Sequence, residues 1–93
     1  MRRLFSPWNG QLMRLHQIPD WPRAVKARSN TAVLANAKRS PLGHFIILDI
    51  QDQGMSHLKL LEASAAIIDK VLAVLNAHTG RPLAEISQLE IGD

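Results

Sequence analysis

The longest regular pattern of apolar residues in the chain lies between Ser56 and Gly80. Apolar side chains recur there at alternating steps of three and four residues, at Leu58, Leu61, Ala65, Ile68, Leu72 and Leu75. This spacing aligns side chains on one face of an α-helix. Ser56 is a residue type that caps helix starts, and Gly80 followed by Pro82 is typical of a helix end. The pattern therefore predicts one long helix from His57 to Thr79.

A second apolar stripe runs beside the first, at Leu60, Ile67, Val71 and Val74. The combined apolar face is wider than a single neighbouring element normally covers. Two interpretations follow: the domain covers the helix on two sides, or the second stripe contacts another copy of the chain. The side chains expected at such a self-association surface are Leu58, Leu60, Leu61, Ile67, Ile68, Val71, Leu72, Val74 and Leu75.

The clearest strand is HFIILDI at residues 44–50, bounded by Gly43 before it and Gly54 after it. Its apolar residues alternate onto both faces, which indicates a strand covered on both sides, or covered on one side by a partner. Residues 3–8 and 11–18 flank Asn9-Gly10, a dipeptide typical of a tight hairpin turn. We therefore expect an N-terminal β-hairpin.

Segment 22–37 allows two interpretations. It is one alanine-rich helix, or a short helix that stops near Ser29-Asn30 and precedes a strand at 31–37. Serine and asparagine side chains bond to nearby backbone and favour breaks, so we favour the second interpretation. After Gly80 we expect a short helix starting at Pro82, with a terminal strand over 86–91 as the alternative.

Together these elements predict a single α+β domain over residues 1–93, a length typical of one domain. In the expected fold, a small antiparallel sheet of three to four strands packs on one long amphipathic C-terminal helix, and a short terminal helix completes the structure. The sequence has no cysteine, which excludes disulfides, zinc–thiolate sites and thiol catalysis. It has no apolar run of the ~20 residues that a membrane span needs and no signal-peptide pattern, so we expect a cytoplasmic protein without a membrane partner.

The formal net charge of +3 conceals an uneven distribution. Residues 1–46 carry eight basic residues and one acidic residue, a balance of +7. Residues 47–93 carry three basic and seven acidic residues, a balance of −4. Such asymmetry is typical of a basic surface that contacts nucleic acid, but it is also produced when the two halves neutralise each other, within one chain or across a dimer.

The basic half supplies the residues expected at a nucleic-acid surface. Lysine and arginine neutralise phosphates, and an exposed aromatic ring stacks on a base. The candidates are Arg2, Arg3, Trp21, Arg23, Lys26, Arg28, Lys38 and Arg39. The set is not interleaved with several aromatic residues and matches no known recognition motif. An ordinary solvated basic face is the more frequent cause of such a run.

Signals for catalysis or metal binding are weak. The four histidines show no ligand spacing, and we expect no metal or cofactor. Asp49 and Asp52 lie at the end of an apolar strand, where α/β enzymes gather catalytic groups, but a strand end that meets solvent explains them as well. Phosphate-binding glycine loops and nucleophile motifs do not occur. We therefore name no catalytic residue and expect that the protein is not an enzyme.

The sequence thus predicts a small non-enzymatic interaction module that self-associates through its long amphipathic helix, as a homodimer. The alternative is an accessory protein that binds nucleic acid, or an acidic protein, through its basic N-terminal half. Oligomeric state and salt-dependent binding of nucleic acid distinguish the two.

Overall fold

A computed structural model describes residues 12–27 and 29–92. The hairpin turn expected at Asn9-Gly10, and the strand expected before it at 3–8, lie outside these residues. The described elements are β1 (Met13–Arg14), a 3₁₀ turn (Leu15–Gln17), α1 (Trp21–Ala24), β2 (Val33–Arg39), β3 (Phe45–Asp52), β4 (Met55–Glu62), α2 (Ile68–Ala77), α3 (Leu83–Ile86) and β5 (Glu90–Ile91).

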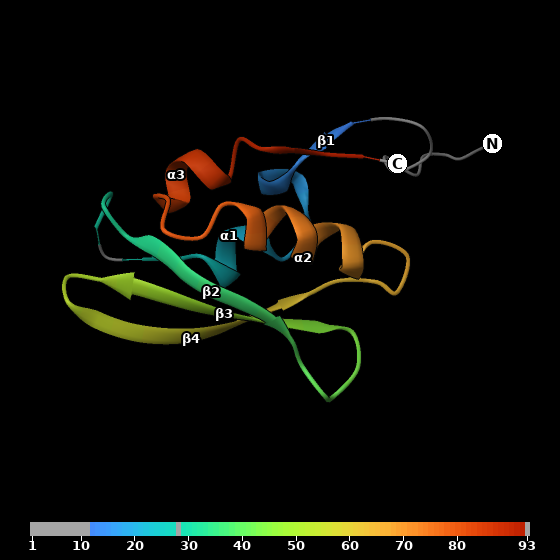
Figure 1. Ribbon diagram of the computed structural model, residues 1–93, viewed down its shortest axis with the longest axis horizontal. Coiled ribbons are helices and arrows are strands. Elements are labelled where there is room, and N and C mark those ends of the chain that lie inside the picture. Colours follow the sequence, from blue (N-terminus) through green and yellow to red (C-terminus); the bar gives the residue numbers. More distant parts are fainter. Residues whose placement is uncertain (1–11, 28, 93) are drawn as a thin grey trace.

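The fold belongs to the α+β class and contains two antiparallel sheets among the described residues. Strands β2, β3 and β4 form a three-stranded sheet in chain order, and β1 pairs with β5 in a two-stranded sheet. The helices lie on one side of the three-stranded sheet, with α2 above β2 (Figure 1). We call the sheet face toward the helices the inner face, and the opposite one the outer face.

The hydrophobic core lies between the inner face and the helices. Strand β3 contributes Ile46, Leu48 and Ile50, each at most 1% exposed. Helix α2 contributes Val71 and Leu75, which are fully buried. The inner face is therefore the face that holds the domain together, and the outer face is not needed for the core.

The long helix predicted over 57–79 is wrong. Its first part is strand β4, and α2 spans only the ten residues Ile68–Ala77. This helix is also not C-terminal, because α3 and β5 follow it. Ser56, predicted to cap the helix, lies within β4 and donates a hydrogen bond to Asp49 Oδ1 at 2.6 Å.

The cause of this difference is the turn between β3 and β4. Gln53 and Gly54 both have positive φ angles, 55° and 78°. A two-residue type I′ turn requires positive φ at both positions, and its twist matches that of paired strands. The turn leads the chain straight back along β3, where Asp52 pairs with Met55 at one end of the ladder and Phe45 with Glu62 at the other. The resulting ladder bonds outweigh the helical spacing of the leucines.

Other parts of the expected fold agree with the structure. Strands β2 and β3 overlap the segments expected at 31–37 and 44–50, although each lies one or two residues further along the chain, and α1 ends before Ser29-Asn30. Gly80 has the positive φ expected of a helix-terminating glycine, and α3 follows Pro82 as expected.

The strand predicted over 11–18 is largely wrong. Among residues 12–18, which the structure describes, only Met13–Arg14 is a strand, and the next three residues form a 3₁₀ turn. Its partner in the described chain is β5, with Met13 opposite Ile91. In the part of the chain that the structure describes, no helix has the length and apolar character needed to cross a bilayer.

Candidate functional site

In the middle of strand β4, apolar side chains point outward and polar side chains point toward the core, which is a reversed polarity. Its outward residues Leu58 and Leu60 are 72% and 55% exposed. Its inward residues His57 and Lys59 are half-buried and lie on the face that carries the core. A strand of a one-sided sheet normally shows the opposite arrangement, with apolar residues inward and polar residues outward. Both faces of β4 are therefore candidate functional surfaces.

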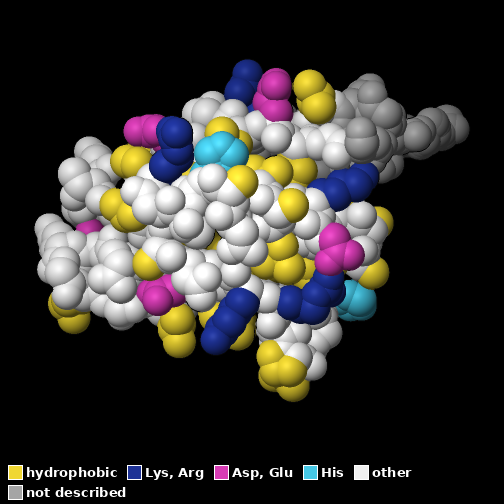
Figure 2. All heavy atoms as spheres, viewed as in Figure 1, with side chains coloured by type: hydrophobic (Ala, Val, Ile, Leu, Met, Phe, Trp, Pro, Cys, Tyr) yellow, Lys and Arg dark blue, Asp and Glu magenta, His cyan; other side chains and the backbone are white. Residues whose placement is uncertain are grey.

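The outer face carries an apolar patch. Leu60 is directly opposite Ile47, and Leu58 is opposite Asp49. Phe45 lies two residues before Ile47 on β3, so its side chain points to the same face, and both side chains are half-buried. We call the set Phe45, Ile47, Leu58 and Leu60 the outer-face patch. Hydrophobic side chains protrude in separate groups along the lower margin of the molecule, both below the sheet and at the β2–β3 loop (Figure 2).

Charged groups flank this patch on two sides. Lys38 of β2 is opposite Ile47 in the sheet, so it shares the outer face and is exposed. Glu62 of β4 is opposite Phe45 and is also exposed. The patch therefore has an ammonium group on its β2 side and a carboxylate on its β4 side.

The residues predicted for self-association are divided between the core and this patch. Leu58 and Leu60 are exposed on the outer face. The remaining seven lie in the core or pack against it: Leu61, Ile67, Ile68, Val71, Leu72, Val74 and Leu75. The wide apolar face that the sequence predicts for one helix is therefore divided in the structure. Part of it belongs to strand β4, and the rest is the buried face of helix α2.

The described residues of the predicted nucleic-acid set do not share one face. Trp21 is 2% exposed, and its indole N–H donates a hydrogen bond to Ser87 Oγ at 2.8 Å. It is therefore not available for stacking on a base. Arg23 forms an ion pair with Asp20 at 3.0 Å. Arg2, Arg3 and Arg28 lie outside the described residues.

The remaining three basic residues point in different directions. Lys38 is on the outer face, whereas Arg39, opposite Ile46, is on the inner face and pairs with Asp69 of α2. Lys26 follows α1 and borders a cavity at the inner face that is described below. The Arg39–Asp69 pair joins the basic half of the chain to the acidic half. Part of the charge asymmetry is therefore neutralised within one molecule.

Asp49 and Asp52 do not form a carboxylate pair. Residues three apart in a strand point to opposite faces, and here Asp49 lies on the outer face and Asp52 on the inner face. Asp52 is 3% exposed and accepts a hydrogen bond from Ser29 Oγ at 2.7 Å. Within residues 12–27 and 29–92, no three His, Asp or Glu side chains form a group that could hold a metal ion.

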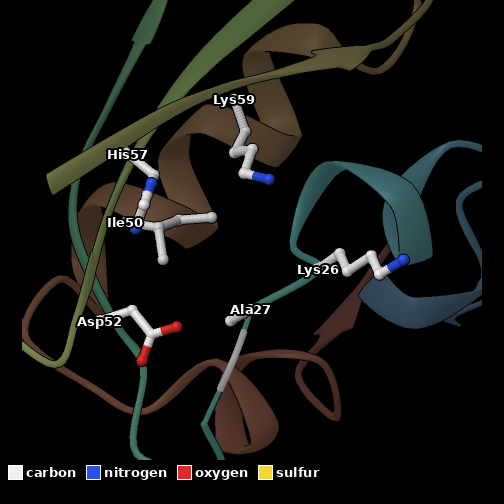
Figure 3. Close-up of a pocket in the computed structure, with 6 residues that line it drawn as sticks. All are labelled: Lys26, Ala27, Ile50, Asp52, His57 and Lys59. Carbon is white, nitrogen blue, oxygen red and sulfur yellow. The ribbon is translucent and has the colours of Figure 1, made fainter. Parts of the chain in front are cut away.

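The inner face has a cavity that the sequence did not reveal. It has a volume of about 290 Å³ and is lined by Lys26, Ala27, Ile50, Asp52, His57 and Lys59. Figure 3 shows the ammonium of Lys59 pointing into the space between β4 and the segment that follows α1. Recognising Gln53-Gly54 as a hairpin turn would have placed His57 and Lys59 on this face. No family model matches the chain, and searches of curated proteins and of solved structures find no significant match.

Proposed function

We propose that the chain is a small non-enzymatic interaction module that forms a homodimer through the outer-face patch of its sheet. The observation that carries this proposal is the exposure of Leu58 and Leu60, 72% and 55%, on a regular edge strand that pairs with β3 along its whole length. Contiguous apolar surface on a small domain is typical of a protein–protein contact. Removing this surface from water contributes roughly 25 cal/mol per Å² of gross stabilisation, which the loss of translational and rotational freedom on association partly offsets.

The charges around the patch favour a second copy of the chain as the partner. Two sheets pack face to face about 10 Å apart with their strands roughly aligned. A two-fold axis parallel to the strands then puts β2 of one copy over β4 of the other. Lys38 shares its cross-strand row with Leu60, and Glu62 occupies the next outward position on β4. The axis therefore places each Lys38 over the partner's Leu60, one outward position from the partner's Glu62, twice per dimer. The same axis brings the two Asp49 carboxylates, each of which accepts a hydrogen bond from Ser56, face to face.

The size of the face indicates a weak dimer. Three strands at a spacing of ~4.8 Å and eight residues at ~3.3 Å each give a face of roughly 14 by 26 Å. This is small compared with the ~800 Å² that each partner buries in a standard interface. We therefore expect a dimer that dissociates on dilution rather than an obligate one.

The test is sedimentation equilibrium over a wide concentration range. We expect the wild-type chain to shift from monomer to dimer, and the double variant Leu58→Thr/Leu60→Thr to dimerise at least about tenfold more weakly. Threonine keeps a strand-favouring branched side chain, so the monomer should lose no more than about 0.5 kcal/mol of stability.

Leu42→Thr provides the matched control. Leu42 is the most exposed of the large apolar side chains described, at 85%, but it lies in the β2–β3 loop rather than on the outer face. Its replacement should leave dimerisation unchanged. A wild-type chain that stays monomeric at every concentration would remove the proposal, and so would a double variant that dimerises as well as the wild type.

A further inference from the structure

The two inward polar residues of β4, His57 and Lys59, border the inner-face cavity, which is separate from the outer-face patch. His57 is paired with Ile50 and Lys59 with Leu48, so both share the face of buried core residues. An apolar residue at either position would extend the core, at lower desolvation cost. Positions that break the polarity pattern of a fold without a structural gain are commonly functional. The outer-face patch does not involve either side chain.

These residues border a concave site with a mixed lining. Ile50 and Ala27 provide an apolar floor, and Lys59 extends over it with its ammonium directed inward (Figure 3). The Lys26 side chain lies on the other side of the cavity and its ammonium points away (Figure 3). Asp52 is at one end, where Ser29 Oγ donates to its carboxylate at 2.7 Å.

We infer that this cavity binds a small organic anion. Its carboxylate or phosphate group would contact Lys59 and His57, and its apolar part would lie on Ile50 and Ala27. An ammonium that is partly withdrawn from water attracts an anion more strongly than one in bulk solvent. The cavity volume of about 290 Å³ is at the lower limit for small-molecule sites, which restricts the ligand to a compact molecule.

A purely structural role for Lys59 makes a different prediction. In that role the aliphatic stem covers the core and the ammonium only needs water. Lys59→Gln keeps most of the stem and removes the charge. The structural role therefore predicts that Lys59→Gln has little effect on anion binding, whereas the inferred site predicts a large loss.

The experiment is an NMR titration of the ¹⁵N-labelled chain with inorganic phosphate and, separately, with acetate. We expect saturable shifts centred on residues 26–27 and 50–59 with at least one of the two anions, and the stronger of the two identifies the anionic group. Lys59→Gln should weaken this binding at least about tenfold, as expected for the loss of a charge-assisted contact. His57→Gln, a second and independent change, should weaken it too.

Arg81→Gln is the control, because it removes a positive charge from an exposed residue that belongs neither to the cavity lining nor to the outer-face patch. It should leave the titration unchanged. The inference is overturned if neither anion causes saturable shifts around the cavity. It is equally overturned if Arg81→Gln weakens binding as much as Lys59→Gln, because the anions would then respond only to net charge. Retained wild-type chemical shifts away from the cavity show that each variant is folded.

Discussion

At the scale of single residues, the fold depends on Gln53 and Gly54. Gly54 has φ +78°, and a Cβ there would meet no atom within 4 Å. A side chain at this position therefore costs stability because of the positive φ angle, and not because it would clash with neighbouring atoms. We expect Gly54→Ala to lower the free energy of unfolding by about 1 kcal/mol. Urea denaturation measures this, and an unchanged stability would show that the turn does not need a positive φ.

At the neighbouring Gln53, we expect a substitution that raises the stability of the fold. It is not a glycine, yet it has φ +55°. Asparagine tolerates this left-handed conformation better than glutamine. We expect Gln53→Asn to raise the free energy of unfolding by roughly 0.5 kcal/mol. Stabilisation at Gln53 together with destabilisation at Gly54 is the signature of a type I′ turn, and a loss of stability at both would argue against it.

A third residue-scale prediction concerns Trp21. Its buried indole N–H donates to Ser87 Oγ, which in turn donates to the carbonyl of Leu83 at 2.8 Å. Ser87→Ala leaves the indole N–H without an acceptor and should cost about 1–2 kcal/mol of unfolding free energy. Trp21→Phe should cost a similar amount. If the bond couples them, the double variant loses less than the sum of the two changes. Strict additivity would contradict the coupling.

At the scale of elements, we expect the polar side chains that β4 directs toward the core to lower the free energy of unfolding. Lys59→Leu places an apolar side chain opposite Leu48 on the inner face. We expect it to raise the free energy of unfolding by up to about 1 kcal/mol and to abolish anion binding, as stabilising changes at functional positions commonly do. Lys26→Leu, at an exposed position outside the sheet, should give no gain in stability. A Lys59→Leu variant that is destabilised would show that the lysine supports the fold.

Strands and helices were predictable from the sequence to different degrees. β3 was predictable because its apolar run is short and has glycines on both sides. β4 was not, because Leu58, Leu61, Ile68 and Leu75 have helical spacing, although Leu58 and Leu60 equally fit a strand. Local spacing cannot decide between the two, since the choice depends on ladder bonds to β3 that form only after the chain turns at Gly54. Strand β1 likewise depends on a distant partner, because it pairs with β5 near the other end of the described chain.

The candidate sites were less predictable than the fold. Sequence reasoning identified Leu58 and Leu60 as side chains for association, although it placed them on a helix. It left open whether Phe45 and Ile47 or the opposite row of β3 lies beside them, because that choice requires the register of the sheet. The basic set was grouped by proximity in sequence, and alternation along β2 sends its neighbours Lys38 and Arg39 to opposite faces.

At the scale of the whole molecule, the proposed dimer depends on the charges at the sides of the outer-face patch. Lys38→Glu places a carboxylate one outward position from the partner's Glu62, and we expect it to weaken dimerisation several-fold, more strongly at low salt. The double variant Lys38→Glu/Glu62→Lys exchanges the two charges and should restore dimerisation. Sedimentation equilibrium at two salt concentrations measures both. A double variant as weak as Lys38→Glu alone would contradict the proposed pairing of β2 over β4.

The most direct test of the proposed dimer through the outer-face patch is a crosslinking measurement between two copies. The chain contains no cysteine, so one introduced cysteine reports on one position. The proposed two-fold axis brings Ile47 of both copies face to face, and a bismaleimide spanning the ~10 Å between packed sheets should join two Ile47→Cys chains. Asn76→Cys, exposed on α2 across the sheet, is the control. We predict efficient dimer formation for Ile47→Cys and only background for Asn76→Cys; equal yields, or a higher yield for Asn76→Cys, would contradict the proposed interface.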